Sequence, residues 1–189
     1  MRYLVCGLLT VIVAVIVGDV ISNRTDKPST EGMNPVQVVE SYYNAFDELD
    51  YRMMGACVTP GIAQDDIGMA VDLFMYTRVR RACPHITWAE TLSAQDWLES
   101  GTPPVDAFIF GITDRRIEQT GLSEGSGGTG YRVDYRLWIT WEYSDENIAP
   151  LETAEMPQSR VYYYSDFVTL DCTEGIWRIS EIHREQQPV

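Results

Sequence analysis

The sequence predicts an α+β domain, in which amphipathic helices come first and antiparallel strands complete the chain. Residues 34–49 carry apolar side chains at helical spacing, whereas residues 131–143 alternate with a period of two. In that second segment the odd positions are apolar or aromatic and the even positions, Trp138 apart, are polar. Two further apolar runs, 161–172 and 176–183, are joined by only three residues. These runs indicate strands that close on one another as a hairpin.

The first helix has a clear start. Asn34 can cap it, and Pro35 occupies the first helical position, where its missing N–H does no harm. The wide apolar stripe that follows consists of Val38, Val39, Tyr42, Ala45, Phe46 and Leu49. Asp50 is expected to cap a short second helix from Tyr51 to Val58. This part of the chain therefore predicts two helices with one buried face.

The middle of the chain is expected to be mostly helical. Asp65 or Asp66 is expected to begin a third helix, and 93–100 a further short helix that Gly101 ends. Residues 105–119 are predicted to form the first long strand. The glycine-rich connection 121–130 lacks the lysine and the strand-to-helix context of a phosphate-binding loop. No nucleotide site is expected there.

The first residues predict a targeting or anchoring element. Residues 4–18 contain no charge and Asp19 follows them. An apolar run of about fifteen residues is short for a membrane span and long for the centre of a cleaved signal. We expect a signal or anchor segment at 1–21, a flexible linker at 22–33 and one domain at 34–189. A retained single-span anchor with the domain outside the cytoplasm is favoured over a secreted protein.

Charge and cysteine content restrict the possible partners. The net charge of −14 at pH 7 repels phosphate backbones, so nucleic acid is not an expected partner. No clustered histidines or paired cysteines predict a metal site, and no cofactor is expected. Cys57, Cys83 and Cys172 are an odd number within the domain, so one disulfide plus one thiol, or three free thiols, are both open.

Two stretches carry a resemblance to a known family. They are the opening Pro35–Phe46 with Leu49 and Asp50 after it, and the ending Phe167–Leu170 with Gly175–Ile182. Together they resemble the nuclear transport factor 2-like superfamily, which includes ketosteroid isomerases and polyketide cyclases. The resemblance implies a cone-shaped roll, with the N-terminal helices packed in a curved antiparallel sheet and a cavity at the open end. The predicted helices of 65–101 depart from the family, which has a short hairpin there.

The resemblance also implies a binding site and a dimer. The candidate ligand-binding residues for a small apolar ligand are Tyr42, Phe46, Tyr135, Trp141 and His183. Alternatively, these aromatic side chains fill the cone completely. Trp138, Tyr163 and Phe167 are expected on the outer sheet face, where they resemble the sheet-to-sheet dimer surface of the superfamily. We therefore expect a homodimer.

Catalysis has less support in the sequence. Family enzymes pair a carboxylate base with a phenol, so Asp134 or Asp166 and Tyr42 or Tyr43 are the candidates. Asp134, however, is flanked by arginines on the polar face of its strand, where a cross-strand ion pair explains it. Asp166 lies within an aromatic strand whose inward phase the sequence leaves open.

Three functions stay open at this point. The first is a membrane-tethered or exported non-catalytic domain that binds a small ligand or acts as an accessory module. The second is a dimeric interaction or assembly domain with a filled core. The third is an isomerase, dehydratase or cyclase that uses a pocket carboxylate. Fold analogy is the only support for the enzyme.

Overall fold

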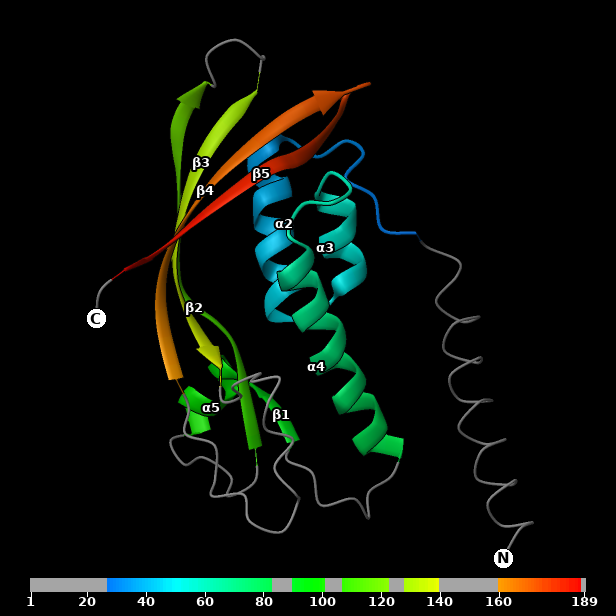
Figure 1. Cartoon of the computed structure of the whole chain (residues 1–189), viewed down its shortest axis with the longest axis vertical. Helices are drawn as coiled ribbons and strands as arrows, with labels where there is room; N and C mark the ends of the chain where they lie inside the picture. The colour runs from blue at the N-terminus through cyan, green and yellow to red at the C-terminus, as the bar shows by residue number, and fades with distance from the viewer. Residues whose placement is uncertain (1–26, 83–89, 101–106, 123–127, 140–159, 188–189) are drawn as a thin grey trace, which may run out of the picture.

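The computed structural model describes residues 27–82, 90–100, 107–122, 128–139 and 160–187. These residues form an α+β arrangement, which confirms the predicted class (Figure 1). On one side of the sheet lie three helices: α2 (Pro35–Asp47), α3 (Tyr51–Cys57) and α4 (Gln64–Ala82). A short helix, α5 (Ala94–Ser100), lies near one end of the sheet (Figure 1).

The described strands make one sheet in the order β1-β2-β3-β4-β5. Their bounds are β1 (Glu90–Ser93), β2 (Ala107–Leu122), β3 (Thr129–Ile139), β4 (Arg160–Thr173) and β5 (Ile176–Gln187). Strand β1 pairs with β2 in parallel, and the other neighbours are antiparallel. Strand β1 was not predicted from the sequence. Four residues are too short for an alternating pattern, and their strand conformation depends on pairing with the distant β2.

The helix starts follow the predicted caps. The Asn34 side chain accepts a hydrogen bond from the Gln37 N–H, and the Gln37 side chain accepts one from the Asn34 N–H in return. The Asp50 side chain accepts from the N–H groups of Arg52 and Met53 at the start of α3. Local polar residues therefore fix where these two helices begin.

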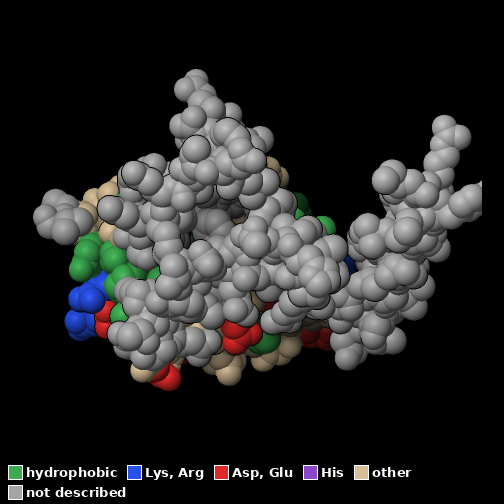
Figure 2. Space-filling view, turned by 90° about the horizontal axis from the view of Figure 1, so that it is seen from below, with side chains coloured by type: hydrophobic (Ala, Val, Ile, Leu, Met, Phe, Trp, Pro, Cys, Tyr) green, Lys and Arg blue, Asp and Glu red, His purple; other side chains and the backbone are tan. Residues whose placement is uncertain are grey.

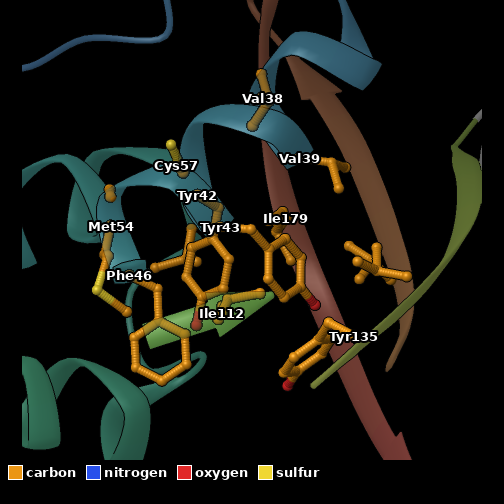
Figure 3. Packing of buried hydrophobic residues seen from close by; sticks show 14 of the residues in the cluster. Val38, Val39, Tyr42, Tyr43, Phe46, Met54, Cys57, Ile112, Tyr135 and Ile179 are labelled. Carbon is orange, nitrogen blue, oxygen red and sulfur yellow. The ribbon is translucent and has the colours of Figure 1, made fainter. Parts of the chain in front are cut away.

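The core lies between α2 and the inward face of the sheet. The predicted stripe of α2 is confirmed as far as Phe46, since Val38, Val39, Tyr42 and Phe46 are fully buried. Leu49, the last residue of the predicted stripe, lies beyond the end of α2 and is partly buried. Figure 3 shows the rings of α2 extending toward the strands, with Tyr135 of β3 approaching Tyr43. Other buried members of this cluster are Met54, Cys57, Val133, Leu137, Val168, Leu170 and Ile179.

The sheet has two distinct faces. The odd residues of β3 point inward as predicted, and the register places Asp166, Val168 and Leu170 of β4 on that same face. The outer face of β3 and β4 therefore carries Trp138, Tyr163 and Phe167, as expected. Strand β5 continues to Gln187, beyond the predicted end at His183. This extension is a correction, and it brings Arg184 into the sheet.

The chain before α2 contacts the domain. Thr30 is buried, and its hydroxyl donates to the Trp177 carbonyl at 3.0 Å. Residues 27–33, predicted as part of a flexible linker, thus include a point of attachment to β5. The predicted segment 1–21 lies outside the described residues. Within those residues, no helix is both long enough and apolar enough to cross a bilayer.

Gly111 marks a close approach between β2, α2 and α5. A Cβ atom there would lie 2.8 Å from Asp47 Oδ1 and 2.9 Å from the backbone nitrogen of Ala94, and φ is +154°. We expect Gly111→Ala to lower the free energy of unfolding by about 2–4 kcal/mol, since backbone cannot move aside cheaply. Urea denaturation measures it. Gly55→Ala is the control, because no atom lies within 4 Å of its added Cβ, and equal stability of the two variants would contradict the argument.

Candidate functional site

The most densely connected polar group is a cluster of charged and phenolic side chains beneath the sheet. We call it the Arg184 cluster, and it comprises Tyr42, Tyr43, Asp66, Tyr135, Asp166 and Arg184. Its members come from α2, α4, β3, β4 and β5. Asp166 is completely buried and Asp66 is 7% exposed. The cluster therefore joins five elements at one buried point.

Arg184 holds both carboxylates in a paired geometry. Its Nε and Nη2 donate to Asp166 Oδ1 and Oδ2, each at 2.9 Å. Its Nη1 and Nη2 donate to Asp66 Oδ1 and Oδ2, each at 2.8 Å. Both contacts are bidentate, which matches the planar fork of the guanidinium. One arginine thus joins α4 to β4.

The phenols complete the shell around the carboxylates. The Tyr43 hydroxyl donates to Asp166 Oδ2 at 2.7 Å, and the Tyr135 hydroxyl donates to the same oxygen at 3.0 Å. The Tyr42 hydroxyl donates to Asp66 Oδ2 at 3.0 Å. These donors offset the second negative charge, because a single guanidinium serves two carboxylates.

The surroundings explain the protonation of the cluster. Burial by itself lowers the pKa of Arg184, but its hydrogen bonds to Asp166 and Asp66 outweigh burial and hold that pKa above its ordinary value. Burial first, and the neighbouring carboxylates second, raise the pKa of Tyr42 and of Tyr43. Burial also raises the pKa of Tyr135. The cluster is thus a protonated arginine with neutral phenols.

This geometry favours a structural role over acid–base catalysis. Asp166 Oδ2 accepts three hydrogen bonds and Oδ1 accepts one from Arg184. The carboxylate is completely buried and paired with a guanidinium, which disfavours its taking a proton from a substrate. The guanidinium of Arg184 lies against the rings of Tyr135 and Tyr164, with its central carbon 5.8 and 5.2 Å from their centroids. The Arg184 cluster can clamp the helices to the sheet.

A hollow in the described surface adjoins the Arg184 cluster at Tyr135 and extends over the outer face of the sheet. It has a volume of about 490 Å³ and is lined by Asp114, Arg132, Asp134, Tyr135, Arg136, Tyr163, Tyr164, Ser165 and Gln187. Most of these residues belong to the outward positions of β3, β4 and β5. On the sheet side of the molecule, left in Figure 2, hydrophobic, basic and acidic side chains of the described residues lie next to one another.

The charges around this hollow are already paired. Arg132 lies 2.9 Å from Asp134, and Arg136 lies 3.0 Å from Asp114. Asp114 sits at a bulge of β2 with a positive φ of 53°, which brings its carboxylate to Arg136. Arg136 also stacks over the Tyr163 ring, 5.1 Å from its centroid. The outer face thus combines aromatic rings with balanced charge.

The candidate ligand-binding residues are divided between the two faces of the sheet. Tyr42, Phe46 and Tyr135 lie together in the buried core, whereas His183 is exposed on the opposite face. Trp141 lies outside the described residues. A binding role for this set stays a prediction.

The two catalytic candidates also separate. Asp134 is on the outer face and pairs with Arg132 along its own strand, not across strands. Asp166 is inward and hydrogen-bonded to Tyr43, the one predicted carboxylate–phenol pair that the structure brings together.

Two members of the Arg184 cluster were missed by sequence reasoning. Arg184 was left just beyond the last predicted strand, which ended at His183, and Asp66 was considered only as the start of a helix. A signal for Arg184 existed, because it continues the inward phase of Ile182 along β5. A buried Asp166 within an aromatic strand also requires a cation. Asp66 left no such signal, since only the fold brings α4 to β5.

The thiols of the described residues are unpaired. Cys57 is buried and Cys172 is exposed, and both are free. Burial raises the pKa of the Cys57 thiol to about 12. Cys83 lies outside the described residues. No group of three or more potential metal ligands occurs in the part of the chain that the structure describes.

Comparisons with protein-family models, with curated proteins and with solved structures return no match for this chain.

The buried phenols predict alkaline instability. The folded pKa values of Tyr42, Tyr43 and Tyr135 are raised, so the stability they contribute is complete below the ordinary tyrosine pKa of about 10 and is lost as pH rises above it. We expect these three phenols to ionise only as the chain unfolds. Phenolate absorbance recorded together with circular dichroism measures both events. Ionisation of all eleven tyrosines near pH 10 with the fold retained would contradict this expectation.

Proposed function

We propose that this chain is a non-catalytic assembly domain, held outside the cytoplasm, that pairs with a second copy of itself through the outer face of its sheet. The observation that carries the proposal is the contrast between the two faces. Tyr42, Tyr43 and Phe46 of the inward face are fully buried, whereas the outer face carries a hollow and the exposed ring of Phe167. The complete burial of these three rings favours a packing role for them.

The register of the outer face supports a two-fold pairing. Outward-facing residues that lie directly opposite one another in β2, β3, β4 and β5 form three rows across the sheet. They are Glu118-Arg132-Phe167-His183, Arg116-Asp134-Ser165-Glu185 and Thr113-Arg136-Tyr163-Gln187. A two-fold axis parallel to the strands, between β3 and β4, places β2 over β5 of the second copy and leaves each row opposite itself.

Each row is complementary to its own reverse. In the second row Arg116 faces Glu185 of the second copy. In the first row Arg132 faces a Phe167 ring, and in the third Arg136 faces a Tyr163 ring, both of which suit cation–π contact. Both rings already lie beside these arginines within one chain. Charge complementarity of this kind selects a partner and an orientation.

The proposal also includes the family of the fold and the attachment of the domain to a membrane. We propose that the sheet and helices form the cone-shaped roll of the nuclear transport factor 2-like superfamily, on the residues given above. Residues 1–21 would hold the domain at a membrane as a single span. The attachment of Thr30 to Trp177 supports a tether that reaches the domain at the β4–β5 hairpin.

Sedimentation velocity tests the pairing. Phe167→Lys places a cation opposite Arg132 of the second copy, and we expect it to convert a dimer to a monomer at about 10 μM, since like charges brought together at an interface are costly. Met75→Lys is the matched control, because Met75 is an exposed hydrophobic residue on α4. A dimer that survives Phe167→Lys, or that Met75→Lys disrupts equally, would overturn the proposal.

A further inference from the structure

We propose that Asp66 occupies the binding position of a ligand carboxylate, which we call the seat. An amphipathic carboxylic acid would bind Arg184 there by displacing Asp66 together with the start of α4. The bound carboxylate would take the Nη1–Nη2 edge of Arg184 and the Tyr42 hydroxyl. This inference does not rest on the proposed pairing, because it concerns the inward face of the sheet.

The seat is built independently of Asp66. Arg184 is held by Asp166 through Nε and Nη2 and lies against the rings of Tyr135 and Tyr164. These contacts keep the guanidinium in place when its other edge changes partner. The Arg184 side chain is 26% exposed, so solvent reaches this group although its partner Asp166 is fully buried. A fork of two N–H groups beside a phenol matches a carboxylate in shape and charge.

The chain enters α4 in a strained backbone conformation, and the proposal requires this entry to open. Gly61 has a φ of +96° and Ala63 a φ of +54°, a left-handed conformation that alanine rarely adopts. The Ala63 carbonyl accepts the Ile67 N–H, yet alanine offers no side chain to cap the first turn. A strained, uncapped entry marks a hinge, and the hydrogen bonds of Asp66 to Arg184 and Tyr42 hold that hinge closed.

The chemical class of the ligand follows from what lies beside the seat. Ala70 and Leu73 of α4 are buried in the same core as Tyr42. Movement of α4 would uncover the apolar surface that Ala70 and Leu73 cover in this core. A ligand that replaces both contacts therefore needs a carboxylate for the guanidinium and a hydrocarbon portion for the surface left by Ala70 and Leu73. A medium-chain fatty acid has that form.

Chemical rescue tests the seat. Asp66→Ala removes the carboxylate, and acetate is the missing fragment. We expect acetate to raise the thermal midpoint of Asp66→Ala by more than about 3 °C relative to chloride at the same ionic strength. Asp65→Ala is the matched control, since Asp65 lies in the same first turn and is exposed. Equal midpoints in acetate and chloride for Asp66→Ala would overturn the proposal.

The unaltered chain gives a second test, which holds even where Asp66→Ala fails to fold. Hexanoate should speed hydrogen exchange of the backbone amides in residues 64–75 at least about threefold over hexanol, because only the acid competes with Asp66 for Arg184. Exchange that is the same in hexanoate and hexanol would exclude displacement of α4 and overturn the proposal.

Discussion

Replacing Arg184 with alanine should lower the free energy of unfolding by about 3–5 kcal/mol, the cost of leaving buried carboxylates without their cation. Asp166 would keep only the Tyr43 and Tyr135 hydroxyls, and Asp66 only that of Tyr42. Two buried negative charges would then repel each other with no positive charge between them. The loss is larger than that of a surface ion pair, which contributes about 0–1 kcal/mol.

Urea denaturation followed by circular dichroism measures this loss as a lower midpoint. The matched control is Arg52→Ala, because Arg52 is exposed on α3, and its effect should stay within about 0.5 kcal/mol. Adding Asp66→Asn to Arg184→Ala should recover part of the loss, since one of the two stranded charges is then removed. If Arg184→Ala lowers the free energy of unfolding no more than Arg52→Ala does, the Arg184 cluster is not what holds α4 to the sheet.

Reversing one charge in the outer-face rows should strongly weaken the proposed dimer. Arg116→Glu would place two acidic groups opposite each other, at positions 116 and 185 of the two copies. Because the proposed axis repeats that contact, each reversal acts twice in the dimer. Like charges brought together at an interface cost several kcal/mol, so we expect the dissociation constant to rise on the order of 100-fold. Glu185→Arg should weaken the dimer to a similar degree.

The double reversal distinguishes this register from any other. A chain with both Arg116→Glu and Glu185→Arg restores opposite charges at both contacts, and we expect its dissociation constant to return to within about tenfold of the unaltered chain. Sedimentation across a concentration series provides the dissociation constants of the unaltered chain, the two single variants and the double variant. A double variant as weak as the singles would show that these side chains do not face each other.

Some of the fold could be read from local signals. Asn34, Pro35 and Gln37 determine the start of α2 through contacts within four residues, and a period of two identified the inward face of β3. Patterns of this kind reflect neighbours in the sequence, so a single sequence contains them. The expectation that Trp138, Tyr163 and Phe167 share the outer face came instead with the family resemblance, because the consecutive tyrosines 162–164 left the phase of β4 open.

The candidate site depended on contacts that no local pattern records. Asp66 and Arg184 are 118 residues apart, and their pairing exists only because α4 packs beside β5. The length of β5 was underestimated for the same reason, since its polar end is held by β4 and not by a core pattern of its own. Strand β1 is likewise defined by its partner. Long-range pairing, rather than composition, decided which residues form the cluster.

The most direct test of the central claim is the mass in solution of a chain that begins at Lys27 and so retains every described residue of the core. Sedimentation equilibrium at about 10 μM, well above the dissociation constant expected for a stable homodimer, should give twice the mass of one chain. A mass of one chain at that concentration would contradict pairing through the outer face of the sheet.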